Sequence, residues 1–420
     1  MTNILSICEK AKIASRNLAL SSTQQKNQAL QTLAGWLLEN KTKIIRENSK
    51  DIALANQAGL DEALVDRLTL TEERIEAMAA DLINVINLPD PVGEVFEEQI
   101  QVNGLKLHKQ RVPLGVIVVI YESRPNVTVD VASLALKSGN AVILRGGSET
   151  LNSNRILVMG IRLALKAANL MDDAVQFIDD PDRELVNQLL KMQQYVDMLI
   201  PRGGAGLHAF CKEHSRIPVI TGGIGICHLF VDASADLGRS IQVIRNAKIQ
   251  RPSVCNALDT VLVHQAISRN FIPKLVSALK TDKVSFRIDK ETIEKLDLET
   301  SEDVQIAGKD DFDTEWLSLV LGIRTVAGLD EALSHINSHS TAHSDGILTN
   351  DPNNAAQFIR EVDSAAVYVN ASTRFTDGAQ FGLGAEVAVS TQRLHARGPM
   401  ALRELTTYKW VGVGDYLVRS

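Results

Sequence analysis

The run Val116-Ile117-Val118-Val119-Ile120 is followed, after a helical stretch, by the run Ala141-Val142-Ile143-Leu144. These runs begin a rhythm in which short apolar segments alternate with helical ones, and the next apolar segments are residues 175–178, 198–200 and 219–220. Near-continuous apolar strands separated by helices are typical of a parallel sheet covered on both faces. The pattern therefore predicts a Rossmann-like α/β domain.

The regions on either side of this rhythm have their own patterns. The first ninety residues predict helices, one capped at Ser22-Thr23 and another beginning with a capping box formed by Thr69 and Glu72. Residues 94–108 alternate weakly after Pro and Gly breaks, which indicates an exposed hairpin that forms an arm. A second α/β pattern begins near Cys227-His228-Leu229-Phe230-Val231 and runs to Phe381.

Size and charge limit the function classes. A chain of 420 residues with 45% apolar composition exceeds what one core usually serves, so two or three domains are expected. A net charge of −7 argues against a nucleic-acid partner, because phosphate backbones require a basic face. An acidic small substrate would need local Arg or Lys residues.

The cysteines and the apolar runs indicate a compartment. The four cysteines are scattered without a CxxC pair or metal-ligand spacing, so we expect reduced thiols, no bound metal and a cytoplasmic protein. The N-terminus has no basic segment with an apolar run behind it, and no run of about eighteen apolar residues occurs. We therefore expect a soluble protein that does not associate with membranes.

Cys255 is the candidate nucleophile. It lies in Gln250-Arg251-Pro252-Ser253-Val254-Cys255-Asn256-Ala257, between a helical stretch over residues 235–249 and the apolar run Thr260-Val261-Leu262-Val263. A thiol on a turn between two rigid elements is able to face a cleft. A single Cys is more often a small buried apolar residue, so the flanking sequence has to decide between the two interpretations.

That flank, with other motifs along the chain, resembles the aldehyde dehydrogenase superfamily, and most closely its branch that reduces an acyl phosphate. The resemblance covers nearly the full length. The motifs that carry it are Val112-Pro113-Leu114-Gly115-Val116-Ile117, Tyr121-Glu122-Ser123-Arg124-Pro125-Asn126, Leu144-Arg145-Gly146-Gly147-Ser148-Glu149, Ile200-Pro201-Arg202-Gly203-Gly204, His343-Ser344-Asp345, Tyr368-Val369-Asn370-Ala371-Ser372-Thr373-Arg374-Phe375, Ser390-Thr391-Gln392-Arg393-Leu394-His395-Ala396-Arg397-Gly398-Pro399 and Leu405-Thr406-Thr407-Tyr408-Lys409-Trp410.

The resemblance implies an aldehyde dehydrogenase-like fold with three parts. These are a cofactor-binding domain over residues 1–93 and 111–223 with a return segment at 386–400, a catalytic domain over 224–385, and an oligomerisation arm over 94–110 and 401–420. The last segment is expected to pair with the early arm and to join subunits, which makes the protein a homo-oligomer.

The resemblance places a nicotinamide cofactor along the strand ends. Its binding residues would be Pro201, Gly203 and Gly204, in a strand-turn-helix where free N–H groups favour an anion, and Arg145, Ser148, Glu149 and Glu315. Superfamily members that use NAD commonly carry a Glu at the position of Ser148, which takes the ribose hydroxyls. Its absence beside Arg145 favours NADPH, because no carboxylate repels the 2′-phosphate. The alternative is that Glu149 takes over this role.

Two further positions bear on the chemistry. Asn126 matches the superfamily Asn whose amide contributes to the oxyanion hole, a donor typically worth about 10²–10³ in rate. Hydrolytic members carry a general-base Glu two residues before the Gly-Gly that is Gly222-Gly223 here, and this chain has Ile220. Isoleucine has no proton-accepting group. This difference disfavours a hydrolytic dehydrogenase.

The sequence does not decide which side chains bind the anionic groups of the substrate or donate a proton. Candidates to hold the substrate's carboxylate and phosphate are Arg124, Arg374, Arg393 and Arg397, since guanidinium groups pair with both anions; a surface role for each is equally open. His343 and His395 are weaker candidates as proton donors, and we expect Cys211 and Cys227 to pack in the core.

The resemblance implies the NADPH-dependent reduction of L-glutamyl 5-phosphate to L-glutamate 5-semialdehyde and phosphate through a Cys255 thioester, in proline biosynthesis. It implies glutamate 5-kinase as supplier of the acyl phosphate, with a functional association between the two enzymes. The alternatives are another acylating or a hydrolytic aldehyde dehydrogenase, or a member of the superfamily without catalytic activity.

Overall fold

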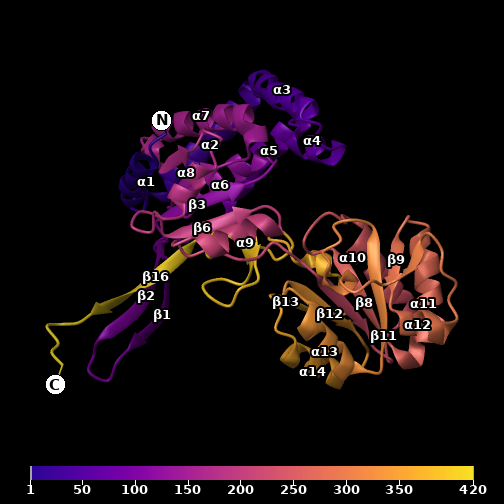
Figure 1. Cartoon of the computed structure of the whole chain (residues 1–420). Helices are drawn as coiled ribbons and strands as arrows, with labels where there is room; N and C mark the ends of the chain where they lie inside the picture. The colour runs from indigo at the N-terminus through magenta and orange to yellow at the C-terminus, as the bar shows by residue number, and fades with distance from the viewer. Residues whose placement is uncertain (1, 420) are drawn as a thin grey trace. The chain divides into compact units, whose positions relative to one another are not determined.

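The computed structural model describes residues 2–419. The chain forms two compact units (Figure 1). Unit 1 comprises the chain up to residue 221, residues 382–388 and the chain from residue 400 on. Unit 2 comprises residues 222–381 and 389–399. Both contain parallel sheets with covering helices, so the expected α/β fold class is confirmed.

Helices make up the first part of unit 1, as predicted. They are α1 (Ile4–Leu18), α2 (Thr23–Glu39), α3 (Lys41–Gln57), α4 (Glu62–Leu68) and α5 (Glu72–Asn87). Ser22 caps α2 in a capping box with Gln25. The predicted box of Thr69 with Glu72 is wrong, because Thr71 caps α5 by accepting a bond from Arg74 N, whereas Thr69 ends α4.

The sheet of unit 1 is parallel, with the strand order β5-β4-β3-β6. Its elements are β3 (Val116–Tyr121), α6 (Asn126–Lys137), β4 (Ala141–Arg145), η1 (Ser148–Thr150), α7 (Leu151–Ala167), η2 (Asp172–Ala174), β5 (Val175–Phe177), α8 (Glu184–Leu189), β6 (Met198–Arg202) and α9 (Ala205–His214). Val116, Val118 and Ile120 pack with α1, whereas α6 and α7 contact the strands as well. The segment predicted as a strand at 219–220 forms only a bridge between Val219 and Leu199.

Unit 2 contains a seven-stranded parallel sheet in the order β10-β9-β11-β8-β7-β12-β13. Its elements are β7 (Cys227–Val231), α10 (Leu237–Ile249), β8 (Leu258–His264), α11 (Gln265–Lys280), β9 (Ser285–Ile288), α12 (Lys290–Leu296), β10 (Val304–Ile306), η3 (Asp311–Asp313), β11 (Val320–Val326), α13 (Leu329–His339), β12 (Ser344–Leu348), α14 (Pro352–Glu361), β13 (Ala366–Val369) and η4 (Thr373–Phe375).

Alternate residues of the central strands of unit 2 belong to two separate cores. Leu229 and Val231 of β7 pack with residues of α10 and α11, whereas Phe230 between them packs with residues of α13 and α14. Figure 1 shows α11 and α12 on one side of the sheet and α13 and α14 on the other. A strand buried on both faces reads as a continuous apolar run, which is why β7 and β8 were visible in the sequence.

The predicted arm is a three-stranded antiparallel sheet that belongs to unit 1. Its strands are β1 (Val95–Ile100), β2 (Lys106–Pro113) and β16 (Thr406–Val413), in the order β1-β2-β16. The expected pairing of the last segment with the early hairpin is present, with Trp410 opposite Lys109. Figure 1 shows the three strands side by side.

The segment expected to return to the cofactor domain, residues 386–400, is divided between the two units. Residues 386–388 and 400 belong to unit 1, and residues 389–399 belong to unit 2. The short strands β14 (Ala388–Ser390) and β15 (Gly398–Met400) pair with each other here. Within unit 2, Ser390 forms a bridge with Gly222.

Candidate active site

Cys255 lies on the turn between the end of α10 at Ile249 and the start of β8 at Leu258. The four cysteines are all in the thiol form, and Cys255 alone among them is half-buried rather than buried. Burial raises the pKa of Cys8 to about 12 and of Cys211 to about 11, and raises the pKa of Cys227 well above its ordinary value. A thiol that resists ionisation is a poor nucleophile. The position of Cys255 is therefore the one that suits a reactive thiol.

Neighbouring segments of unit 2 hold the backbone of Cys255. The Cys227 thiol donates to the Cys255 carbonyl oxygen over 3.3 Å. Gly225 approaches so closely that a Cβ on it would collide with the same carbonyl. Cys227 thus packs in the core, as expected, and it also contacts the nucleophile turn.

Arg374 is brought to the nucleophile turn. Its Nη1 donates to Asn256 Oδ1, and its Nε donates to Gln250 Oε1 over 3.1 Å. Asn256 is buried and its Nδ2 donates to the Thr376 carbonyl over 2.8 Å. Burial lowers the pKa of Arg374, and the nearby Arg251 lowers it further. Arg374, one of the four predicted arginines, therefore contacts the residue next to Cys255.

Arg393 and Arg397 meet at one carboxylate, that of Asp363. Arg393 donates through Nη2 to Oδ2, and Arg397 donates through Nη1 to Oδ1 over 2.6 Å. Bonds from Arg397 hold the pKa of Asp363 below its usual value. Both arginines line a pocket of about 240 Å³ together with Asp363, Ser364 and Thr391. Arg124, the fourth arginine, lies in unit 1 just before α6.

Glu315 lies in unit 2 and is joined to the segment that contacts Cys255. Its Oε1 accepts a bond of 2.8 Å from Gly225 N. Burial raises the pKa of Glu315, whereas the bond from Gly225 lowers it. The carboxylate therefore already organises backbone at the nucleophile turn.

Asn126 is the first residue of α6 in unit 1. Its Nδ2 donates to Asp130 Oδ2 over 2.8 Å. Burial raises the pKa of Asp130 to about 6, and Asp81 adds to this effect, whereas the Asn126 bond and Arg202 lower the pKa. Sequence reasoning missed Asp130, although its position four residues after Asn126 in a predicted helix was a signal.

The cofactor residues at the end of β4 occupy different environments. Arg145 is buried; its guanidinium donates to the carbonyls of Gly146 and Pro181, and its Nε has no hydrogen-bond partner among the described residues. Ser148 is exposed. Glu149 Oε1 accepts bonds from Ser123 N and Oγ over 2.8 and 2.7 Å. One Glu149 oxygen is therefore engaged in binding the neighbouring loop.

The glycine turn after β6 carries a carboxylate that the sequence did not reveal. Gly204 N, at the start of α9, donates to Glu122 Oε2 over 3.1 Å, and a Cβ on Gly203 would collide with the Glu122 carboxyl group. Pro201 is the fourth residue of β6 and is buried. In the structure, the group that accepts from this turn at the start of α9 is the Glu122 side chain.

Two other positions have clear local roles. Ile220 is buried and its N–H donates to the Leu199 carbonyl over 2.8 Å. His343 is fully buried in unit 2, where its Nδ1 lies 2.8 Å from Ser344 Oγ. Burial lowers the pKa of His343 to about 4, so this side chain is neutral at pH 7. His343 therefore suits a structural role better than that of a proton donor.

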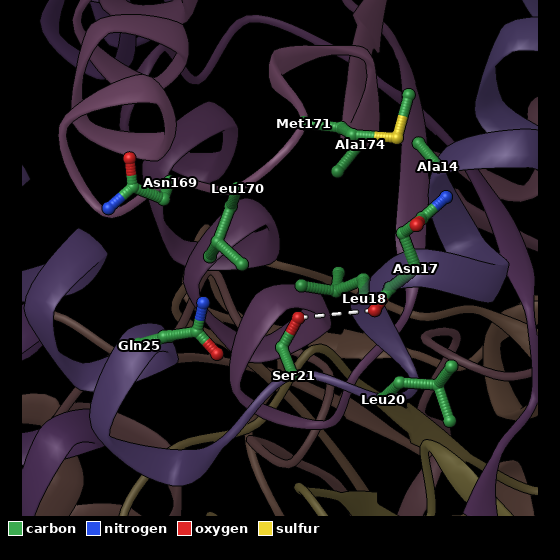
Figure 2. A pocket seen from close by; sticks show the side chains of 10 residues that line it. All are labelled: Ala14, Asn17, Leu18, Leu20, Ser21, Gln25, Asn169, Leu170, Met171 and Ala174. Atoms are coloured by element: carbon green, nitrogen blue, oxygen red, sulfur yellow. Dashed lines mark hydrogen bonds between the residues drawn. The ribbon is translucent and has the colours of Figure 1, made fainter.

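A second pocket, of about 260 Å³, lies in unit 1 between the end of α1, the start of α2 and residues 169–174 (Figure 2). Its polar lining consists of Asn17, Ser21, Gln25 and Asn169, and Ser21 Oγ donates to the Asn17 carbonyl over 3.2 Å. None of the predicted site residues lines it. Cavity size therefore does not identify the candidate site, whereas the chemistry around Cys255 does.

Comparison with known proteins gives consistent matches. The family model described as the aldehyde dehydrogenase family matches residues 2–294 and 311–411. A curated gamma-glutamyl phosphate reductase of Vibrio vulnificus is 56% identical over 418 residues, which cover 100% of both chains. One of Vibrio cholerae is 58% identical over 410 residues, covering 98% of each.

A solved structure has the same fold over its whole length. The crystal structure of a gamma-glutamyl phosphate reductase from Thermotoga maritima is similar with a TM-score of 0.97 at 47% identity, covering 100% of both chains. Among the described residues, no helix is both long and apolar enough to span a bilayer.

Proposed function

The chain belongs to the aldehyde dehydrogenase family, and we propose that it reduces L-glutamyl 5-phosphate to L-glutamate 5-semialdehyde and phosphate, with NADPH as the reductant. The observation that carries this proposal is the identity of 56% over 100% of both chains to a curated gamma-glutamyl phosphate reductase. The half-buried Cys255 on its turn supports the same chemistry. The reaction serves proline biosynthesis.

Cys255 is the proposed nucleophile. Its thiolate attacks the acyl carbon of the substrate, the bond to the phosphate oxygen breaks, and phosphate leaves with that electron pair, giving a thioester on Sγ. Nicotinamide, when bound, supplies the hydride that reduces this thioester. The resulting thiohemiacetal releases the aldehyde as the carbon–sulfur bond breaks and the thiolate is restored.

Asn126 is the proposed amide donor to the oxyanion that develops in each step. Donors of this kind are typically worth about 10²–10³ in rate. The bond to Asp130 fixes the orientation of the Asn126 amide, with its nitrogen toward Asp130, because a carboxylate only accepts.

Ile220, buried and without a proton-accepting side chain, leaves no general base at its position. The thioester is therefore expected to exchange with phosphate rather than to hydrolyse.

The residues at the end of β4 suit a nicotinamide cofactor with a 2′-phosphate. Arg145 Nε is a buried donor without a partner among residues 2–419, and an anionic group suits such a donor. Ser148 is exposed and uncharged, and one Glu149 oxygen is engaged by Ser123. Ser148, Arg145, Pro201, Gly203, Gly204 and Glu315 would hold the cofactor. We propose a preference for NADPH on this basis.

The carboxylate and phosphate of the substrate require cationic partners. Arg374 contacts the nucleophile turn through Gln250 and Asn256, which supports a role for it near the reacting carbon. Arg393 and Arg397 share Asp363, so an incoming anion would compete with that carboxylate for them. Arg124, Arg393 and Arg397 remain proposed substrate ligands without assignment to either anion.

We also propose that the protein is a homo-oligomer joined through the arm. Exposed apolar side chains gather there, including Ile100, Trp410 and Val413. Lys109 Nζ lies 4.5 Å from the Tyr408 ring centroid and 5.0 Å from that of Trp410, which gives the arm a defined aromatic face.

The acyl phosphate would come from glutamate 5-kinase, with which we propose a functional association. The four thiols suit the reducing cytoplasm.

Acyl transfer to Cys255 is directly testable. The protein is mixed with glutamyl 5-phosphate made in place by a glutamate kinase with ATP and glutamate, without NADPH, and after acid quenching the masses of the intact protein and of its proteolytic peptides are measured. The expected result is a glutamyl adduct on the peptide that contains Cys255, and no adduct in Cys255→Ala. Cys211→Ala is the control, because Cys211 is buried in unit 1 and should leave the adduct unchanged. Adduct formation in Cys255→Ala would overturn the assignment.

A further inference from the structure

The turn that carries Cys255 is closed at its base by a buried ion pair. Lys248 lies in the last turn of α10, and Asp259 is the second residue of β8. The two side chains are 0% and 3% exposed, and Lys248 Nζ lies 3.6 Å from Asp259 Oδ1. Residues 250–257 lie between these two elements. The pair therefore joins the two ends of the nucleophile turn.

The same carboxylate also binds two other segments of unit 2. Asp259 Oδ1 accepts a bond of 3.2 Å from Trp316 N, and Oδ2 accepts one of 3.4 Å from Cys227 N. Each donor belongs to a segment involved with the nucleophile turn. Cys227 donates through Sγ to the Cys255 carbonyl, and Trp316 follows Glu315.

Glu315 is linked to the Cys255 carbonyl through Gly225. It accepts a bond from Gly225 N, and Gly225 packs directly on that carbonyl oxygen. The Asp259 carboxylate therefore contacts three segments, around residues 225–227, 248–259 and 315–316. In these bonds the Asp259 carboxylate accepts from backbone N–H groups, those of Cys227 and Trp316.

Burying such a pair is costly. Burial raises the pKa of Asp259 to about 6, with Lys248 opposing the rise, and burial lowers the pKa of Lys248. Lys248 Nζ has no hydrogen-bond partner among the described residues. Proteins in which apolar side chains of similar volume replace a buried ion pair are often as stable as the original or more stable. Stability alone therefore gives little reason for these two charges at the base of the turn.

We propose that Lys248 and Asp259 are positioning residues for Cys255. Asp259 fixes the nucleophile turn and the Glu315 segment through backbone N–H groups, and Lys248 compensates its buried charge. This inference rests on the proposed function, since it takes Cys255 as the nucleophile.

The test compares Asp259→Asn, Lys248→Met and the double variant with the parent. Four quantities are measured for each variant: kcat per folded protein, KM for the acyl phosphate, the rate at which iodoacetamide alkylates Cys255 from pH 6 to 9, and the urea midpoint. We expect kcat to fall by about tenfold to a hundredfold while KM changes little, because a misplaced reacting group loses rate rather than binding. The pH profile of Cys255 alkylation should shift.

The double variant separates positioning from stability. Removing both charges leaves no unpaired buried ion, so its urea midpoint should exceed that of Lys248→Met. Its kcat should remain low, because the carboxylate that binds Trp316 N and Cys227 N is absent. A double variant with kcat within about twofold of the parent, and with the parent's alkylation profile, would overturn the proposal. Asp259→Asn, which keeps shape and one acceptor oxygen, serves as the mildest variant if the others fail to fold.

Unit 1 provides a matched control. Lys26 and Asp90 form another buried pair, 1% and 8% exposed and 2.5 Å apart. Lys26→Met should lower the urea midpoint while leaving kcat and Cys255 alkylation unchanged. An equal loss of kcat per folded protein in Lys26→Met would show that any buried pair has this effect. If Cys255→Ala keeps its activity, the assignment of Cys255 as the nucleophile fails, and this inference fails with it; if Cys255→Ala is inactive while Asp259→Asn behaves as the parent, this inference alone fails.

Discussion

Asn126 donates through Nδ2 to Asp130 Oδ2 over 2.8 Å, one helical turn further along α6. An amide has two N–H donors, and this bond takes one of them. The second N–H group is on the same nitrogen, and the amide oxygen of Asn126 points away from the Asp130 carboxylate. The proposed oxyanion donor is thereby set in one of its two amide orientations by a residue that needs no contact with the substrate.

Asp130→Asn should lower kcat by about tenfold with little change in KM, because an amide at position 130 accepts or donates and no longer selects the nitrogen side of Asn126. Steady-state kinetics with the acyl phosphate measure this. Asp81→Asn is the control, since Asp81 raises the pKa of Asp130 but no bond joins it to Asn126 among those described. Parent-like kcat in Asp130→Asn would contradict the positioning role.

Ser148→Glu should erode the preference for NADPH by about tenfold or more, because a carboxylate at this exposed position repels the 2′-phosphate and accepts bonds from ribose hydroxyls. The measurement is the ratio of kcat/KM with NADPH to kcat/KM with NADH. Ser148→Ala should keep the parent ratio. A parent enzyme that uses NADH equally well would show that position 148 does not govern the choice.

Trp410→Glu should lower the molar mass in solution, because Trp410 is 53% exposed on the arm and a charge there disfavours burial against another subunit. Light scattering after size-exclusion chromatography reports the mass. Ile306→Glu in unit 2, where Ile306 is 50% exposed on β10, is the matched control and should leave the mass unchanged. If both variants keep the parent mass, the arm is not the subunit contact.

The buried His343 should make the protein sensitive to acid. Its pKa is lowered from about 6.5 to about 4 in the folded state, so below pH 6.5 the unfolded state binds the proton first. The free energy of unfolding should therefore fall between pH 6.5 and pH 4, by about 3 kcal/mol from this group, and the loss is complete below pH 4. His343→Gln should flatten this part of the urea-denaturation profile. An unchanged pH dependence in His343→Gln would rule out this source.

The elements that the sequence predicted well are those with a strong local pattern. β3, β4, β7 and β8 are almost entirely buried, and each contains a run of at least three consecutive apolar residues. The cap of α5 was misplaced by two residues because Thr69 and Thr71 both precede an acidic stretch, and only the backbone geometry selects Thr71.

The parts of the candidate site that the sequence did not reveal depend on contacts between distant segments. Glu122 binds Gly204, which lies 82 residues further along the chain, and Asp363 binds both Arg393 and Arg397. In the sequence, Lys248 and Asp259 are charged residues near Cys255 that match no functional motif. A burial environment, set by tertiary packing, distinguishes them. No spacing rule places an acceptor in a remote loop.

A requirement for phosphate separates an acyl phosphate reductase from a hydrolytic aldehyde dehydrogenase. In the oxidative direction, the unmutated enzyme is supplied with glutamate semialdehyde and NADP⁺, and NADPH formation and free glutamate are followed in buffers with and without phosphate. We expect NADPH to form only when phosphate is present, because the Cys255 thioester is released to phosphate and buried Ile220 provides no base for hydrolysis. Oxidation to free glutamate at the full rate in phosphate-free buffer would show that the enzyme is a hydrolytic dehydrogenase and not an acyl phosphate reductase.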